Sequence, residues 1–369
     1  MVAVAASFRR HGPADRAQGT DRMLPSHLAA LEARAQCRTE ALGGPRSQGP
    51  DCGALEESAH ACQHRHCPTC QHAAAPRWLA QQRARLLPGP DWLGTVTLPE
   101  ALRPVARAPQ RCLDHRRWPT SAAALQALAL DPRDLGGPSG MVGGLHPWTR
   151  DLASHPHVHS LVPGGALSPE GGPWLSPRCD AWRVPVRALS TRGRGTGQAA
   201  LTPAGLATLV PPQVWHTHWV THCTPAGPGT EVLPSGAPCL SRSALTTNRL
   251  DTREDGHGTF RVTQRSGARG KRLTRPAEAC IHRFLQQGLP QGCPTVRSDG
   301  VLRPRRRTML PQRRTLVAAC PTTAPAPASG PPRASSTPPP TPAAARWCRP
   351  CGGRRVVVGR LSPHPREPP

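Results

Sequence analysis

The sequence predicts an α+β protein, and three observations lead to this prediction. Short alternating runs typical of β-strands are interspersed with segments whose apolar residues recur at helical spacing. Cysteines and histidines crowd together between Cys52 and His72, which indicates a metal-binding segment ahead of most of the strands. Residues 322–345 are almost entirely proline, alanine, serine and threonine, a composition typical of disordered chain. We therefore expect a helical zinc-binding domain at residues 8–92, an α+β domain at residues 93–320 and a disordered tail at residues 321–369.

The expected elements follow from periodicity and from turn signals. Residues 23–43 predict a helix, because Leu24, Leu28, Leu31 and Leu42 have helix-compatible spacing and a glycine follows. Strand candidates are the runs at residues 94–99, 141–148, 157–163, 181–189 and 258–264. Further helices are expected at residues 121–130 and within residues 276–290, where Ile281, Phe284, Leu285 and Leu289 share one helical face. Short strands mixed with helices in this way indicate an α+β domain.

The cysteine-rich segment predicts a structural zinc site. The chain has 14 cysteines and no recognisable secretion signal, which favours thiolate ligands over a disulfide framework. The spacing of Cys67 and Cys70 presents two thiolates to one tetrahedral zinc, and Cys52 and Cys62 can complete four ligands. Four protein ligands leave no open position for chemistry, so this zinc would be structural. The alternative is a set of free buried thiols.

A second cysteine pair lies near the end of the sequence. Cys348 and Cys351 have the spacing of a zinc knuckle and are followed by two glycines. No obvious second pair accompanies them, so the sequence predicts a remnant or a weak site here.

The run from Ala153 to Gly165 contains two histidines that flank one apolar residue. Successive side chains of a strand point to opposite faces, so we expect His157 and His159 on one face and Val158 on the other. Neutral imidazole is the commonest protein ligand for metals, and this pair would supply half of a metal site. A polar strand face without a metal is the alternative.

The charge balance points to a polyanionic partner. The net charge is +25, and Lys271 is the only lysine, so nearly all the positive charge is arginine. Guanidinium groups suit bidentate phosphate contacts, which favours nucleic acid, although a GC-rich genome would also enrich arginine. The densest basic patch is Leu302–Arg314, whose alternative interpretation is a solvated basic tail. The candidate DNA-binding residues within it are Arg303, Arg305, Arg306 and Arg307.

The sequence has no segment expected to enter or cross a membrane. No window approaches the roughly 20 apolar residues that span a bilayer. The charges near the start follow the short apolar run, which is not the order of a secretory signal. We therefore expect a cytoplasmic protein.

Several sequence blocks resemble one family of transposases. They are "FRRHGPADR", "CRTEALGG", "CQHRHCPTCQ", "RWLAQQRARLLPGP", "TLPEALRP", "HPHVHSLVPGGALSPEG" and "IHRFLQQGLPQG". Their order is similar to that in rolling-circle transposases of insertion-sequence family 91, and the resemblance runs from Phe8 to Arg307. This family resembles the HUH nucleases, named for two histidines around a hydrophobic residue. The resemblance implies an antiparallel sheet with helices on one side, a preceding zinc-binding domain, and single-stranded DNA as the partner in DNA transposition.

The resemblance also implies a chemistry for the paired histidines. His157 and His159, with a third polar ligand, would hold Mg²⁺ or Mn²⁺ that polarises the scissile phosphate. A tyrosine hydroxyl would then attack and form a 5′-phosphotyrosine, which allows the strand to be transferred. The family is expected to carry two such tyrosines, four residues apart.

The chain departs from the family at this point, because it contains no tyrosine at all. A gapless alignment places Ser235 and Cys239 at the two tyrosine positions, and a second alignment places Cys239 and Ser243 there. Arg150 stands where a glutamine would be usual. A thiolate attacks phosphodiesters poorly, so we expect a protein of the transposase family that is impaired in covalent strand transfer. A domesticated zinc-dependent nucleic-acid-binding protein and a non-functional pseudogene product are the alternatives.

Overall fold

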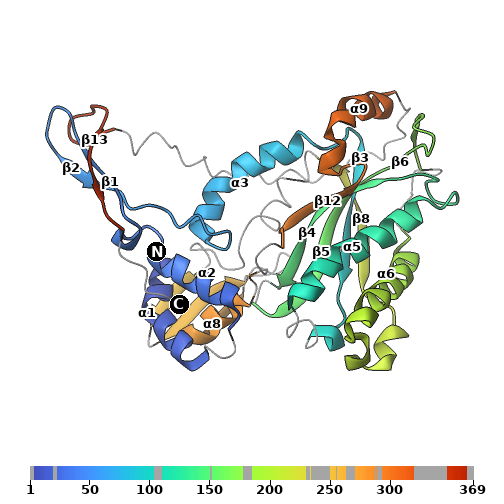
Figure 1. Ribbon diagram of the computed structural model, residues 1–369, viewed down its shortest axis with the longest axis horizontal. Helices are drawn as coiled ribbons and strands as arrows, with labels where there is room; N and C mark the ends of the chain where they lie inside the picture. Colours follow the sequence, from blue (N-terminus) through green and yellow to red (C-terminus); the bar gives the residue numbers. More distant parts are fainter. Residues whose placement is uncertain are drawn as a thin grey trace. The chain divides into compact units, whose positions relative to one another are not determined.

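The computed structural model of the chain forms two compact units (Figure 1). One unit comprises Met1–Pro76, Arg242–Gly288 and Pro331–Pro369, and the other comprises Arg77–Ser241 and Leu289–Gly330. The structure describes residues 4–19, 23–103, 110–149, 152–177, 185–229, 233, 250–254, 256–262, 271–286, 288, 293–319 and 347–363.

The unit that contains Arg77–Ser241 is built on a five-stranded antiparallel sheet. Its strand order is β12-β4-β5-β3-β8. The strands are β3 (Pro90–Thr97), β4 (Gly140–Trp148), β5 (Ser154–Pro163), β8 (Thr221–Pro228) and β12 (Val296–Gly300), and β6 (Ala166–Leu167) pairs with β7 (Trp174–Leu175). The helices are α5 (Gln110–Ala129), α6 (Val186–Leu201) and α9 (Leu310–Ala318), with short 3₁₀ segments at Glu100–Leu102, Thr202–Ala204, Ala207–Leu209, Pro212–Trp215 and Pro304–Met309. An antiparallel sheet with helices confirms the α+β prediction.

The two faces of this sheet bury different cores. Val158 and Val162 of β5 face a cluster that includes Trp118 and Leu125 of α5. Figure 1 shows α5 and α6 together on this side of the sheet. Leu161, on the alternate face of β5, packs in a second cluster with residues that include Val317 of α9. The strand period of two therefore directs successive β5 side chains to opposite sides.

Helix α6 replaces one of the expected strands. Residues 181–189 predicted a strand because of their alternation, but Val186–Leu189 form the first turn of α6, and residues 178–184 lie outside the described part of the chain. The buried positions of α6 include Gly193 and Gly197, and a Cβ on Gly197 would lie 2.7 Å from the Trp219 ring. The helix thus packs through glycines, which an apolar periodicity does not reveal. None of the described helices has the length and apolarity needed to cross a membrane.

The other unit contains a group of helices. They are α1 (Val4–Gly19), α2 (Pro25–Gln36), α8 (Ala277–Leu285) and the 3₁₀ turn Glu40–Leu42, while α3 (Pro68–Arg83) begins in this unit and ends in the other. Phe8 of α1 meets Phe284 of α8 edge to face, with ring centroids 5.6 Å apart. Ile281, Phe284 and Leu285 are buried as the helical spacing predicted, whereas Leu289 lies outside the described residues.

Two three-stranded antiparallel sheets belong to the same unit. One has the order β11-β10-β9 and the other β13-β1-β2. Their strands are β1 (Gly44–Gln48), β2 (Leu55–Glu57), β9 (Leu250–Glu254), β10 (His257–Val262), β11 (Lys271–Pro276) and β13 (Val356–Leu361). Strand β13 corrects the prediction of a disordered tail at residues 321–369, because backbone pairing with β1 orders the segment around it. The proline- and alanine-rich residues 322–345 lie outside the described part of the chain.

A buried carboxyl group in β3 makes the stability of the sheet dependent on pH. Asp91 is 3% exposed, and its Oδ2 accepts a hydrogen bond from the backbone N–H of Gly229 at 2.7 Å. Burial raises the pKa of this carboxyl to about 8, whereas an unfolded chain would have a value of about 3.9. Over the interval from about pH 4 to pH 8 the folded chain holds a proton that the unfolded chain has lost, so stability falls as pH rises.

We expect Asp91→Asn to remove this pH dependence, because the amide stays neutral and keeps an oxygen that can accept from Gly229. Relative to the unaltered chain, the variant should gain roughly 4 kcal/mol of unfolding free energy as the pH is raised from 5 to 8.5, because each pH unit up to the folded-state pKa contributes about 1.4 kcal/mol. Urea unfolding at the two pH values measures the difference. Glu170→Gln changes an exposed carboxylate and serves as the control. Parallel pH profiles for Asp91→Asn and the unaltered chain would contradict the prediction.

Candidate metal centres and nucleic-acid interface

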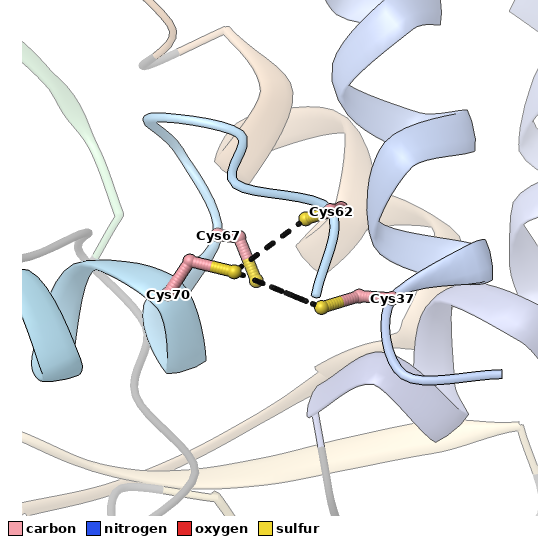
Figure 2. Close-up of side chains that lie close together, drawn as sticks. All are labelled: Cys37, Cys62, Cys67 and Cys70. Atoms are coloured by element: carbon pink, nitrogen blue, oxygen red, sulfur yellow. Dashed lines mark hydrogen bonds between the residues drawn. The ribbon is translucent and has the colours of Figure 1, made fainter. Parts of the chain in front are cut away.

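Four cysteine side chains converge where α2 ends and α3 begins (Figure 2). Cys37 is the residue that caps the C-terminal end of α2, and its N–H donates to the carbonyl of Arg34. Cys67 and Cys70 lie at the start of α3, and Cys62 belongs to the loop before it. The end of α2 lies beside the Cys67–Cys70 turn, which brings together Cys37 and Cys70, 33 positions apart in the sequence.

The sulfur positions fit a tetrahedral zinc ion. The Sγ atoms of Cys37 and Cys70 lie 3.8 Å apart, those of Cys62 and Cys70 3.7 Å, and those of Cys67 and Cys37 3.6 Å. Four sulfurs around one zinc at about 2.3 Å lie roughly 3.8 Å from one another. Burial, with Cys67 nearby, raises the pKa of the Cys70 thiol to about 11. A bound cation would therefore be needed to hold all four groups as thiolates.

A buried arginine supplies positive charge beside these sulfurs. Arg34 is 1% exposed, and its guanidinium carbon lies 3.5 Å from the ring centroid of Phe284 and 4.8 Å from that of Phe8. Burial lowers its pKa to about 9, and the charges of the neighbouring cysteines oppose this shift. Among the described residues, its side-chain nitrogens have no hydrogen-bond partner. Since zinc with four thiolates carries a net negative charge, Arg34 would offset part of that charge.

Cys52 does not join this group, which corrects the ligand set expected from the sequence. The predicted set was Cys52, Cys62, Cys67 and Cys70, whereas the structure brings Cys37 to the last three. Cys52 lies in the turn between β1 and β2, and its Sγ is 3.4 Å from that of Cys348. The sequence argument chose the cysteines nearest along the chain, and the helix end carrying Cys37 lies nearer in space.

Strand β5 places the two histidines of the His-Val-His run on one face. His157 Nε2 and His159 Nε2 lie 3.0 Å apart, and Val158 is buried on the opposite face. The Nδ1 of His157 contacts the carbonyl oxygen of His155 at 2.5 Å, so this nitrogen donates and Nε2 is the nitrogen that can accept or ligate. The Nδ1 of His159 lies 3.0 Å from Thr95 Oγ1 of the neighbouring strand. Both rings are thus fixed with Nε2 toward the same point.

His146 of β4 is a third imidazole at this point, and the sequence analysis did not identify it. It lies opposite His157 in the β4–β5 register, and its ligand atom is within 4.8 Å of those of His157 and His159. Burial, followed by the charges of His159 and His157, lowers the pKa of His146 well below its usual value. It is therefore neutral near pH 7, the form that binds metals. The sequence could have revealed His146 through the register of the predicted hairpin, because pairing of residues 146 and 157 places the two histidines opposite each other.

A cationic side chain lies beside the histidines. Arg103 donates through its Nη2 nitrogen to Nδ1 of His155, 3.1 Å away, and pairs with Glu100 at 3.1 Å. Its Nε is buried and has no hydrogen-bond partner among the described residues. His155 in turn lies against His157, with ring centroids 5.2 Å apart. This arrangement separates the guanidinium of Arg103 from His157 by one imidazole, that of His155.

The arginine-rich segment 302–314 divides into exposed and buried parts. Arg303, Arg305 and Arg306 are exposed, although Arg303 pairs with Asp299 at 2.9 Å. Nothing is described of the Arg307 side chain. Arg313 is 2% exposed and donates to the carbonyl of Val301, so it is a packing residue of the unit. The exposed basic surface therefore includes fewer arginines than the segment 302–314 contains.

The positions of the expected tyrosines and of one departure lie outside the described residues. They are Ser235, Cys239, Ser243 and Arg150.

Comparisons with known proteins match two parts of the chain to transposase families. Residues 7–98 match the model of the transposase zinc-binding domain, and residues 140–309 match that of a family described as "Putative transposase". The chain is 34% identical over 319 residues to the "Putative transposase y4qJ" of Sinorhizobium fredii (strain NBRC 101917 / NGR234), an alignment that covers 81% of this chain and 80% of the relative. The chain belongs to the transposases of insertion-sequence family 91.

A second relative of this transposase family matches over a shorter stretch. The transposase for insertion sequence element IS801 of Pseudomonas savastanoi pv. phaseolicola is 32% identical over 124 residues, which is 32% of this chain and 28% of the relative. No solved structure matches the chain. The zinc-binding domain match and the converging cysteines together support a structural zinc in this transposase.

Proposed function

We propose that this transposase-family chain binds single-stranded DNA and holds a divalent cation at His146, His157 and His159, but does not form the covalent protein–DNA link. The observation that carries the proposal is the 3.0 Å approach of the two Nε2 atoms on β5, with His146 beside them, in a sequence that contains no tyrosine. Metal binding and nucleophilic attack are separate requirements of the same reaction. We propose that the chain retains the metal site and has lost the nucleophile.

The donor set favours one of the two expected cations. Three imidazoles form a nitrogen site, and no carboxylate of a described residue joins the group. Mg²⁺ prefers oxygen ligands and near-octahedral geometry, whereas Mn²⁺ binds imidazole nitrogen more readily. We therefore propose Mn²⁺ rather than Mg²⁺ as the cation of this site. When bound, the cation would polarise a phosphate oxygen and bring a water molecule close to the phosphorus.

The surroundings of the site suit a phosphodiester. Arg103 reaches His155, which leaves its buried Nε available for a phosphate oxygen beside the histidines. Thr95 and the carbonyl of His155 fix the orientation of the histidine rings. Arg103 is therefore proposed as a phosphate-positioning residue.

Binding should depend steeply on salt. Arg305 and Arg306 are exposed on the 3₁₀ segment Pro304–Met309, and the net charge is +25. Each phosphate contact releases condensed counterions, so the affinity for a labelled single strand should fall about 300-fold between 50 and 200 mM salt if roughly six contacts form.

The test compares a variant that removes two exposed arginines of this segment with one that removes an exposed arginine elsewhere. Arg305→Ala with Arg306→Ala should reduce the logarithmic salt slope by about 1.4, since each contact on a single strand contributes about 0.7. Arg133→Ala removes an exposed arginine that is already paired with Asp131 at 2.8 Å, and it should leave the slope unchanged. Fluorescence anisotropy of a labelled oligonucleotide, single-stranded and duplex, measures both. A flat salt response or equal slopes for all three proteins would exclude phosphate-driven binding by these arginines.

A further inference from the structure

Two turns with the same backbone geometry lie next to each other in the sheet that contains β1 and β13. The first is Gly49-Pro50-Asp51-Cys52-Gly53, and the second is Cys348-Arg349-Pro350-Cys351-Gly352. In the first, the N–H of Gly53 donates to the carbonyl of Gly49 at 3.0 Å, and in the second the N–H of Gly352 donates to that of Cys348 at 2.8 Å. The last glycine of each has a left-handed backbone, with φ of 68° and 70°. Each turn thus has the geometry that presents ligands from its first and fourth residues.

Three of the four ligand positions in these turns are cysteines. The Sγ atoms of Cys52 and Cys348 lie 3.4 Å apart, and all three sulfurs, including that of Cys351, lie within 4.8 Å of one another. Cys348 is 2% exposed. A group of three converging thiols matches the preference of zinc for soft sulfur ligands.

Gly49 occupies the fourth position. Gly49 is the first residue of the first turn, as Cys348 is the first residue of the second turn. A Cβ built on Gly49 would lie 2.5 Å from Cys348 Sγ and 2.8 Å from Cys52 Sγ, which is closer than real Cβ contacts, so a side chain here would lie against the two sulfurs and require them to shift. Among the described residues, no further histidine, cysteine, aspartate or glutamate joins the group. The site therefore has three protein ligands and one open side.

We propose that Cys52, Cys348 and Cys351 bind a second zinc ion, whose fourth ligand is a water molecule or small anion on the side of Gly49. This site is separate from the four-cysteine group, which contains none of these three residues. It also differs from the weak or remnant site that the isolated pair Cys348 and Cys351 predicted, because Cys52 comes from the other turn.

The proposed zinc would fasten the last described strand to the first. Cys52 and Cys348 are 296 positions apart, and β13 follows Cys351 directly into its pairing with β1. The remaining links nearby include the ion pair between Arg355 and Glu56 and the one between Arg46 and Glu57. Because β13 has an exposed, valine-rich face, the backbone pairing and the metal are what would hold it in place.

Zinc counting on the full chain, purified under reducing conditions, tests the proposal. The combined variant Cys52→Ser, Cys348→Ser and Cys351→Ser should contain about one zinc fewer per chain than the unaltered protein, since it keeps the four-cysteine group. Limited proteolysis should cut the variant faster near β13. Equal zinc contents, or a disulfide between Cys52 and Cys348 in place of the ion, would overturn the proposal.

A second pair of variants tests the open position and does not depend on removing ligands. Gly49→Cys supplies a fourth thiolate, and we expect it to retain the second zinc against a chelator at least tenfold longer than the unaltered chain. Gly49→Ala adds the same Cβ without sulfur and is the matched control, which should lose zinc at least as fast as the unaltered chain. Cobalt substitution adds a spectroscopic readout, because Gly49→Cys should increase the sulfur-to-cobalt charge-transfer absorbance. If Gly49→Cys behaves like Gly49→Ala in both measurements, the open position is not where we place it.

Discussion

Replacing Cys37 by serine is expected to unfold the part of the chain that surrounds the four-cysteine group. The substitution removes one of four thiolates whose sulfurs are 3.6–3.8 Å apart. Structural zinc binding is coupled to folding, so the remaining three ligands would hold the ion too weakly to keep α2 and α3 joined. We expect the free energy of unfolding to fall by roughly 4 kcal/mol or more, the range reached when a structural metal is lost. Zinc content and urea unfolding followed by circular dichroism measure the two effects.

Two further serine variants show whether the loss is specific to the ligand. Cys280→Ser alters a thiol of α8 that is also buried, at 8% exposed, but that belongs to none of the metal groups of the described residues. This substitution should lower the free energy of unfolding only slightly, because a hydroxyl is close in size to a thiol. Cys52→Ser should leave the four-cysteine group intact. If Cys37→Ser resembles Cys280→Ser while Cys52→Ser loses the structural zinc, the ligand set deduced from the sequence is correct and the one in the structure is not.

The features that the sequence predicted well are local in the chain. The strand period of two was sufficient to place His157 and His159 together and Val158 in the core, since this depends only on alternation. The spacing of Ile281, Phe284 and Leu285 placed one face of α8 correctly for the same kind of reason. In both cases the information lies within a few consecutive residues.

The features that the sequence did not reveal depend on pairing over long distances. Cys37 becomes a neighbour of Cys70 because α2 ends where α3 begins, and β13 pairs with β1 across most of the sequence. His146 required the register of the β4–β5 hairpin, which the sequence indicated only as two neighbouring strands. Residues 186–189 were predicted as part of a strand because their polar and apolar residues alternate, whereas they begin α6, whose buried positions include Gly193 and Gly197 and give no apolar periodicity. Loop closure and register are decided by the whole fold, so a local pattern carries little of that information.

The three-histidine site and the missing tyrosines lead to an expectation about the reaction products. The family chemistry needs a hydroxyl with phenol-like acidity, and this sequence of 369 residues has no tyrosine. Ser235 is a far weaker acid than a phenol, and the thiolate of Cys239 attacks phosphodiesters poorly. With Mn²⁺ bound, water would remain as the available nucleophile. Slow nicking without strand transfer is the result that this combination of groups supports.

We therefore expect no covalent protein–DNA adduct when the chain is incubated with labelled single-stranded DNA and manganese. A denaturing gel should show free nicked DNA, and His157→Ala with His159→Ala should abolish it, because the two Nε2 atoms that lie 3.0 Å apart are removed. Ser235→Tyr with Cys239→Tyr restores two phenols and should produce label that migrates with the protein, whereas Cys239→Tyr with Ser243→Tyr tests the alternative alignment. Loss of a nucleophile typically costs several orders of magnitude in rate, so the adduct should be absent rather than merely reduced in the unaltered chain. A labelled band migrating with the unaltered protein would show that Ser235 or Cys239 acts as the nucleophile. Nicking that survives the histidine substitutions would show that the β4–β5 site is not the centre of the reaction.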